Sequence, residues 1–168
     1  MLHRRTAGHR MSTPLHVHGT CVACGARAVL MRGPSGSGKS DLAFRLLRDD
    51  PSGETRIVAD DRVVLSAVGN GLVASAPPAL AGLVELRGLG LLAMPAMAEA
   101  RLALIVDLVA RDRVPRLPEP RFEALLGVSL PVLALHAFDL TAAAKLRLAL
   151  ETLPDSGFPG SDGRFGGR

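Results

Sequence analysis

The feature that most constrains this chain is a glycine-rich segment between a short apolar run and a helix-like pattern. Its sequence, GPSGSGKS, fits the phosphate-loop pattern G-x-x-x-x-G-K-[ST]. In such a loop the backbone N–H groups point at phosphate oxygens, and the helix that follows adds its positive end. The segment therefore predicts an α/β fold whose nucleotide-binding loop consists of Gly33, Pro34, Ser35, Gly36, Ser37, Gly38, Lys39 and Ser40.

Two residues of this loop suggest the ligand. In the pattern, the lysine, here Lys39, reaches the β- and γ-phosphates, and the hydroxyl of the last residue, here Ser40, binds Mg²⁺. If the loop had no chemical role, the glycines around Lys39 would be unexplained. We therefore expect ATP and Mg²⁺ as cofactors.

The rest of the chain predicts one mixed α/β domain over residues 14–153. Disordered segments are expected at 1–13, which is polar and without period, and at 154–168, which is rich in glycine. Apolar patterns and turn signals predict strands at 15–24, 28–31, 57–59, 72–76, 102–109 and 128–135, with 62–66 continuing the strand 57–59 in extended form, and helices from 40 to before Pro51 and over 140–153.

Composition excludes several other classes of protein. With 48% hydrophobic and 21% charged residues, the chain is typical of a globular domain. The net charge of +4 comes partly from basic residues near the two ends, and aromatic residues are only 3%, so we expect no nucleic-acid binding. Apolar runs fall short of the ~20 residues of a membrane span, and no signal peptide is evident, which predicts a cytoplasmic protein without membrane contact.

The two cysteines, Cys21 and Cys24, have a spacing seen in zinc and redox sites. A structural zinc site needs four ligands, and the sequence has no second pair. We interpret them as strand residues near a turn, with metal binding alongside a neighbouring histidine as the alternative.

Phosphoryl transfer also needs a carboxylate that accepts the proton of the attacking hydroxyl. Asp60 and Asp61 end an apolar strand, where a carboxylate would meet the metal of a phosphate-loop site, and we take Asp61 as a candidate metal ligand. Glu85 and Arg87 flank one apolar residue and so share a face of an extended segment. The alternatives are a capping or turn role for the aspartates and a surface ion pair for Glu85 and Arg87.

His18 precedes Gly19 in the first predicted strand. Its imidazole would be able to contact a phosphate or tune a carboxylate. A purely structural role is the alternative for a single histidine.

Three further motifs follow the glycine loop in order. They are VADDRV at 58–63, APP at 76–78 and VELRGLG at 84–90. Together with the loop they resemble the catalytic domain of HPr kinase/phosphorylase. The resemblance covers residues 18–90 and continues more weakly to residue 150.

This resemblance implies a bacterial serine kinase that uses ATP to phosphorylate HPr, the small carrier protein of the sugar phosphotransferase system. Asp60 resembles the carboxylate that takes the serine proton, while His18 and Lys39 resemble other active residues. Ser40 and Glu85 resemble the magnesium ligands, and residues 84–93 the signature loop. The family's hexamers imply a homo-oligomer.

The sequence departs from the family in two respects. Only a short polar stretch precedes His18, as in the short form expected in alphaproteobacteria, and residues 131–138 lack the cations of the loop that family members use to remove the phosphate. Weak phosphorylase activity is therefore expected. Arg116, in a proline-containing loop, is the candidate for the family's further catalytic arginine, with a solvated loop arginine as the alternative.

Two other functions compete with a protein kinase. A nucleotide-sensing regulatory protein would need Lys39 and Ser40 but no proton acceptor, so Asp60 separates it from a kinase. A small-molecule phosphate-loop kinase would need a lid rich in arginine, and the only such cluster is the short stretch 111–113.

Overall fold

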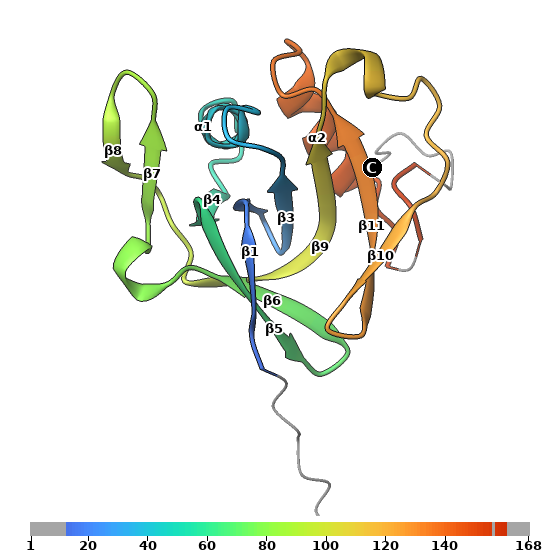
Figure 1. The fold of residues 1–168 in the computed structure, drawn as a ribbon, viewed down its shortest axis with the longest axis horizontal. Coiled ribbons are helices and arrows are strands. Elements are labelled where there is room, and N and C mark those ends of the chain that lie inside the picture. The colour runs from blue at the N-terminus through green and yellow to red at the C-terminus, as the bar shows by residue number, and fades with distance from the viewer. Residues whose placement is uncertain (1–12, 156, 161–168) are drawn as a thin grey trace, which may run out of the picture.

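The computed structural model describes residues 13–155 and 157–160, and shows a mixed α/β fold with a strongly curled sheet (Figure 1). The strands are β1 Leu15–His18, β2 Thr20–Cys24, β3 Arg27–Arg32, β4 Thr55–Ala59, β5 Arg62–Val68, β6 Gly71–Ser75, β7 Leu83–Leu86, β8 Gly90–Ala93, β9 Glu99–Leu108, β10 Phe122–Leu125 and β11 Val128–Leu135. The helices are α1 Lys39–Arg48 and α2 Ala142–Glu151, with short 3₁₀ turns at Pro78–Leu80 and Arg111–Arg113.

Strand β9 organises the sheet. It pairs in parallel with β3 along one edge, while its other edge pairs antiparallel with β6 through Glu99 to Leu102 and then in parallel with β11 through Ile105 to Leu108. The strand order is β1-β5-β6-β9-β3-β2-β4, with β10 and β11 off this path. Because one edge serves two partners, β6, β5 and β1 lie across one face of the sheet (Figure 1).

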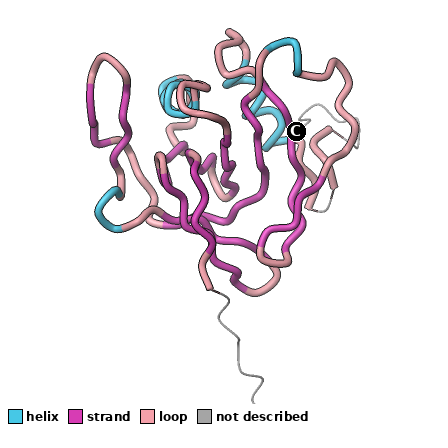
Figure 2. The backbone as a smooth tube through the Cα atoms, in the orientation of Figure 1, coloured by secondary structure: helices cyan, strands magenta, loops and turns pink. Residues whose placement is uncertain are grey.

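This arrangement gives two hydrophobic cores, one on each face of β3. Val29 and Met31 pack towards α1 and α2, whereas Ala28 and Leu30 pack against the layer formed by β5 and β6. The division follows from the alternation of side chains along a strand. Figure 2 shows both helices on the side of the central strands opposite the β5–β6 layer.

The structure confirms most of the predicted elements and corrects the first one. The predicted strand at 15–24 is broken at Gly19, where an added Cβ would lie 2.7 Å from the Met31 carbonyl oxygen. Gly19 N–H donates to the Asp61 carbonyl at 3.1 Å, so β1 pairs with β5 while β2 pairs with β3 and β4. Strand β10 and the separate β7–β8 hairpin were not predicted.

The predicted terminal segments are only partly visible. The N-terminal extension lies outside the described residues except for Thr13, and residues 156 and 161–168 of the predicted tail lie outside them too. Within the described part of the tail, Phe158 is buried and its ring meets Phe122 edge-on, with centroids 6.3 Å apart. The prediction of a disordered tail therefore does not hold at Phe158.

Both cysteines lie in β2, as the strand interpretation predicted. Cys21 is fully buried, and burial raises the pKa of its thiol far above the ordinary value. Burial also raises the pKa of Cys24, whose Sγ lies 3.9 Å from Thr55 Oγ1. Among the described residues, no three His, Cys, Asp or Glu side chains are grouped so as to hold a metal ion.

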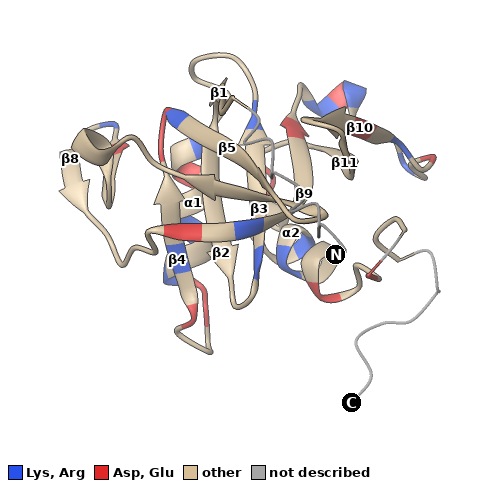
Figure 3. Cartoon of the chain, turned by 90° about the horizontal axis from the view of Figure 1, so that it is seen from below, with Lys and Arg blue, Asp and Glu red and all other residues tan. Residues whose placement is uncertain are grey.

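Two further features concern nucleic-acid and membrane partners: the distribution of charged residues and the character of the helices. Lys and Arg lie on several elements and are interspersed with Asp and Glu (Figure 3). Neither described helix has the length and apolar character needed to cross a membrane.

Candidate active site

A cleft of about 650 Å³ lies at the start of α1, where the glycine loop, the ends of β1 and β4, the β7–β8 hairpin and the segment after β11 meet. Most predicted site residues line it, including His18, Lys39, Ser40, Asp60, Asp61 and Glu85. Because these residues come from four separate segments, the fold brings together what the sequence spreads over 68 positions, from 18 to 85.

The glycine loop connects β3 to α1, as predicted. Gly38 has φ 90°, a left-handed conformation that side chains rarely adopt, and a Cβ there would lie 2.7 Å from the Cβ of Ala137. The position therefore requires glycine on two grounds. The first residues of α1, whose N–H groups have no partner within the helix, border the cleft.

Lys39 is buried, although it carries a charge. Its Nζ donates to the carbonyl oxygens of Gly33 at 2.9 Å and Pro34 at 3.0 Å, so the loop wraps around the ammonium. Ser37 Oγ is also buried and has no hydrogen-bond partner among the described residues. A cation and the free N–H groups at a helix start form a donor set that fits nucleotide phosphates.

Asp60 is the buried carboxylate of the cleft. Its Oδ1 accepts hydrogen bonds from Thr20 Oγ1 at 2.6 Å and Ser40 Oγ at 3.0 Å, and its Oδ2 from the Glu85 N–H at 3.2 Å. These bonds fix one carboxylate between β2, the start of α1 and β7. Asp60 therefore lies directly beside Ser40, the hydroxyl expected to bind Mg²⁺, and at the end of β4 as predicted.

Asp61 faces the open side of the cleft instead. Its backbone has φ 65°, a left-handed conformation that aspartate tolerates better than most residues. His18 Nδ1 lies 3.0 Å from the Asp61 carbonyl oxygen and 3.2 Å from its Oδ1, and both side chains are more than half exposed. The turn at Asp61 thus separates the two aspartates, one buried and one accessible.

Glu85 lies on the exposed face of β7, since its neighbours Val84 and Leu86 are buried, whereas Arg87 follows the strand in the turn between β7 and β8. Both charged side chains line the cleft. The ion pairs among the described residues do not include one between Glu85 and Arg87, so the surface-pair alternative is not supported.

Arg116 is not brought to the cleft. It is exposed in the loop between β9 and β10 and is absent from the residues that line the cleft. Its catalytic role stays a prediction that the fold of a single subunit does not support.

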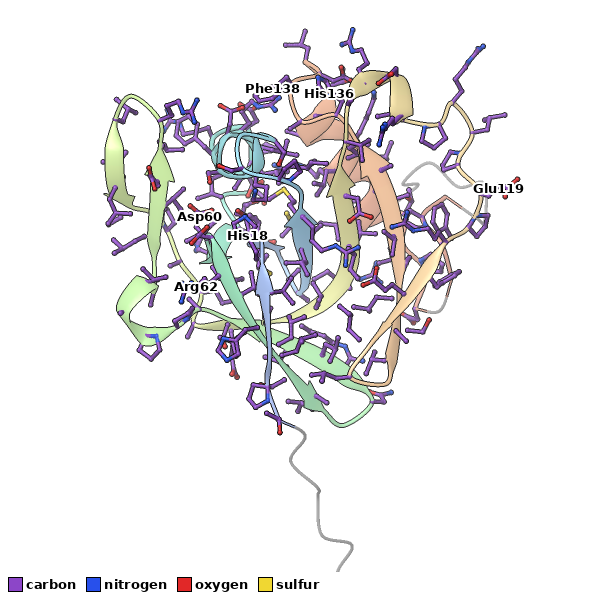
Figure 4. The ribbon with its side chains drawn as sticks, viewed as in Figure 1. His18, Asp60, Arg62, Glu119, His136 and Phe138 are labelled. Carbon is purple, nitrogen blue, oxygen red and sulfur yellow. The ribbon has the colours of Figure 1, made fainter. Side chains whose placement is uncertain are left out.

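Residues 131–138, which the sequence resemblance matched to a loop of the family, lie mostly in a strand. Leu133, Ala134 and Leu135 belong to β11 and pair with β9, so they do not occupy a loop beside the phosphates. The residue of this segment that lines the cleft is Phe138, which follows the strand (Figure 4). The turn after β11, rather than β11 itself, therefore faces the candidate site.

Two site residues were missed in the sequence. Thr20 is fully buried and holds Asp60, and its signal was a polar residue beginning the apolar run of β2. Phe138 gave no pattern signal, because it stands in a turn whose position depends on contacts far along the chain.

Comparison with known proteins agrees with the fold and the motifs. The family described as the HPr serine kinase C-terminal domain matches residues 9–135. HPr kinase/phosphorylase of Bordetella petrii is 37% identical over 122 residues, and that of Bordetella pertussis 38%; each match covers 66% of this chain and 38% of the relative. A structure titled as the Hpr(Ser) kinase/phosphatase from Coxiella burnetii superposes with a TM-score of 0.69 at 23% identity, covering 79% of this chain and 94% of that one.

The chain thus spans well under half the length of the curated relatives it matches. The family match, by contrast, extends over most of the chain, from before β1 to the end of β11. It includes the glycine loop, both aspartates and Glu85, which are the residues that the cleft brings together. The chain belongs to the HPr serine kinase C-terminal domain family.

Proposed function

We propose that this domain is a serine kinase that transfers the γ-phosphoryl group of ATP to the phosphocarrier protein HPr, with Mg²⁺. The observation that carries the proposal is the position of Asp60, a buried carboxylate hydrogen-bonded to Ser40 at the end of the glycine loop. A nucleotide sensor needs the loop but has no use for a proton acceptor beside it.

The residues divide the chemistry among them. Lys39 and the loop N–H groups hold the phosphates and neutralise charge, and Ser40 and Glu85, with Asp61 nearby, would hold the metal. Bound Mg²⁺ would supply further neutralisation of the phosphate charge. Asp60 takes the proton of the acceptor serine. At the same time the Oγ of that serine forms a bond to the γ-phosphorus, and the bond between this phosphorus and ADP breaks.

His18 has a positioning role in this account. Its ring contacts the left-handed Asp61 and so holds the accessible carboxylate at the edge of the cleft. Weak phosphorylase activity, assembly into a homo-oligomer and a cytoplasmic location complete the proposal. The first rests on a departure from the family at residues 131–138, the second on the family resemblance, and the third on apolar runs that are too short for a membrane span.

The test is transfer of label. The purified chain is incubated with γ-labelled ATP, Mg²⁺ and HPr from the same organism, and phosphoserine in HPr is identified by mass spectrometry. Stoichiometric phosphoserine is expected. Binding of ATP without transfer would indicate the nucleotide sensor, and transfer to a small molecule in place of HPr the small-molecule kinase.

A further inference from the structure

Phe138 is an exposed aromatic ring at one end of the cleft, with 59% of its surface accessible. We propose that it is the platform on which the purine base of the nucleotide stacks, and that the turn after β11 is the base-binding segment of the site. This inference rests on the proposed nucleotide site and names the part of the ligand that Phe138 recognises.

The direction of the nucleotide follows from where the charged groups lie. Asp60 and Glu85 come from β4 and β7, on one side of the glycine loop, and the reacting phosphate must face them. In the sheet, β4 and β11 lie on opposite sides of β3, the strand that leads into the loop. A nucleotide whose terminal phosphate faces Asp60 therefore extends its base towards the segment after β11.

Figure 4 shows the same separation. Asp60 and His18 lie together on one side of the start of α1, whereas His136 and Phe138 lie on the other. Asp60, Glu85 and Phe138 all line one cleft. A single ligand can therefore touch both ends.

The ring is held in place rather than free. Its Cζ and Cε1 lie 3.0 and 3.2 Å from the position that a Cβ of Gly38 would occupy, so the ring packs against the turn of the glycine loop. The His136 ring meets it edge-on, with centroids 5.7 Å apart, and His136 Nδ1 lies 3.0 Å from the Val109 carbonyl oxygen.

The backbone of the segment is fixed as well. Arg45 of α1 donates to the carbonyl oxygens of Ala137 and, at 3.2 Å, Asp139. Arg111 binds the Asp139 carboxylate from the other side, and this contact lowers the pKa of Asp139. A rigid aromatic with an open face loses little conformational entropy when a flat ligand stacks on it.

The test separates the base from the phosphates. Binding of ADP and of tripolyphosphate is measured by calorimetry for the wild type, Phe138→Ala, Phe138→Leu and Phe138→Trp. Leu140→Ala is the matched control, because Leu140 is 95% exposed in the same turn and does not line the cleft. Leu keeps bulk against Gly38 without an aromatic face, and Trp keeps the face.

We expect Phe138→Ala and Phe138→Leu to raise the Kd for ADP about tenfold, the scale of one base–aromatic stack, with tripolyphosphate unchanged. Phe138→Trp and Leu140→Ala should bind ADP like the wild type. Unchanged ADP binding in Phe138→Ala, or an equal loss for ADP and tripolyphosphate, would overturn the inference while leaving the nucleotide site intact. A wild type that binds neither ligand would overturn the proposed function together with the inference.

Discussion

At the residue scale, the Asp60 carboxylate is held by hydrogen bonds from three groups: the hydroxyls of Thr20 and Ser40 and the N–H of Glu85. Such fixing removes the rotameric freedom that a proton acceptor would otherwise lose when the substrate binds. It also aligns the carboxylate with the hydroxyl expected beside the metal. Lys39 is fixed in a similar way by two loop carbonyls, so both charges are in place before a nucleotide arrives.

Replacing Lys39 by alanine should abolish transfer and weaken ATP binding, because the ammonium neutralises phosphate charge as the bond breaks. The measurement is labelled phosphate transferred to HPr, together with the Kd for ATP. Arg48→Ala is the control, since Arg48 is an exposed cation at the other end of α1 and should leave both quantities unchanged. Turnover like that of the wild type in Lys39→Ala would refute the role given to the loop.

At this scale, the sequence predicted the site residues that are adjacent to one another in the chain. The eight loop residues and the aspartate pair are short patterns whose geometry depends on local backbone, and they occur at the predicted places. Thr20 and Phe138 were missed because each acquires its role through contacts with residues far away in the chain, as in the 40-residue separation between Thr20 and Asp60.

At the scale of elements, an aspartate whose side chain is buried joins α1, β4 and α2 away from the cleft. Asp50 accepts hydrogen bonds from the Thr55 N–H at 2.7 Å and the Ser52 N–H at 3.0 Å, and pairs with Arg147 at 3.2 Å. Arg147 in turn donates to the Leu46 carbonyl at 2.8 Å. This cluster holds the end of the helix whose start carries the glycine loop.

Asp50→Asn should therefore lower the free energy of unfolding by about 2 kcal/mol, the scale of charge-assisted hydrogen bonds in a buried place. Urea unfolding of the two proteins measures the difference. Asp41→Asn is the control, because Asp41 belongs to an exposed i,i+4 pair with Arg45 and should change stability by less than about 0.5 kcal/mol. Equal effects of the two substitutions would contradict the assignment.

The same cluster predicts a pH dependence. Burial raises the pKa of Asp50, but hydrogen bonds from Thr55 and Ser52 outweigh burial, so the net pKa lies below the ordinary 3.8. The stabilisation from this carboxylate is thus present above pH 3.8 and is lost as the pH falls through the lowered folded-state value. Unfolding curves between pH 5 and 2 should converge for the wild type and Asp50→Asn, and curves that stay parallel would contradict this.

The sequence predicted elements well where one periodicity dominates, as in α1 and β11. It failed at Gly19, because the break between β1 and β2 depends on the close approach of the Met31 carbonyl from β3. Strand β10 was missed because its burial alternates between exposed and half-buried, so its residues carry no strong apolar signal. Its pairing with β11 is what makes it a strand.

At the scale of the whole molecule, the curled sheet leaves one open cleft, with carboxylates at one end and Phe138 at the other. No sequence pattern predicts this curl, since it arises from β6 and β11 sharing an edge of β9. The cations of the cleft are few. Lys39 and Arg87 line it, together with His18, and the turn after β11 contributes Phe138 instead of a lysine or arginine.

This shortage of cations predicts an enzyme that phosphorylates HPr much faster than it removes the phosphate. Removing the phosphate with inorganic phosphate places a second dianion beside the first, and the repulsion must be offset by cations or N–H donors. We expect phosphate-dependent dephosphorylation of serine-phosphorylated HPr, with pyrophosphate as product, to be much slower than the forward reaction under matched conditions. Comparable rates would show that the missing cations are irrelevant or come from a neighbouring subunit.

The account depends most on Asp60 acting as the proton acceptor, and Asp60→Asn tests this directly. The rate of phosphoserine formation in HPr and the Kd for ATP with Mg²⁺ are measured for the variant and the wild type, with a thermal melt to confirm folding. We predict that the rate falls about 10²–10⁴-fold while ATP binds with nearly unchanged affinity. A variant that phosphorylates HPr at the wild-type rate, or that loses ATP affinity in proportion to its rate, would contradict the account.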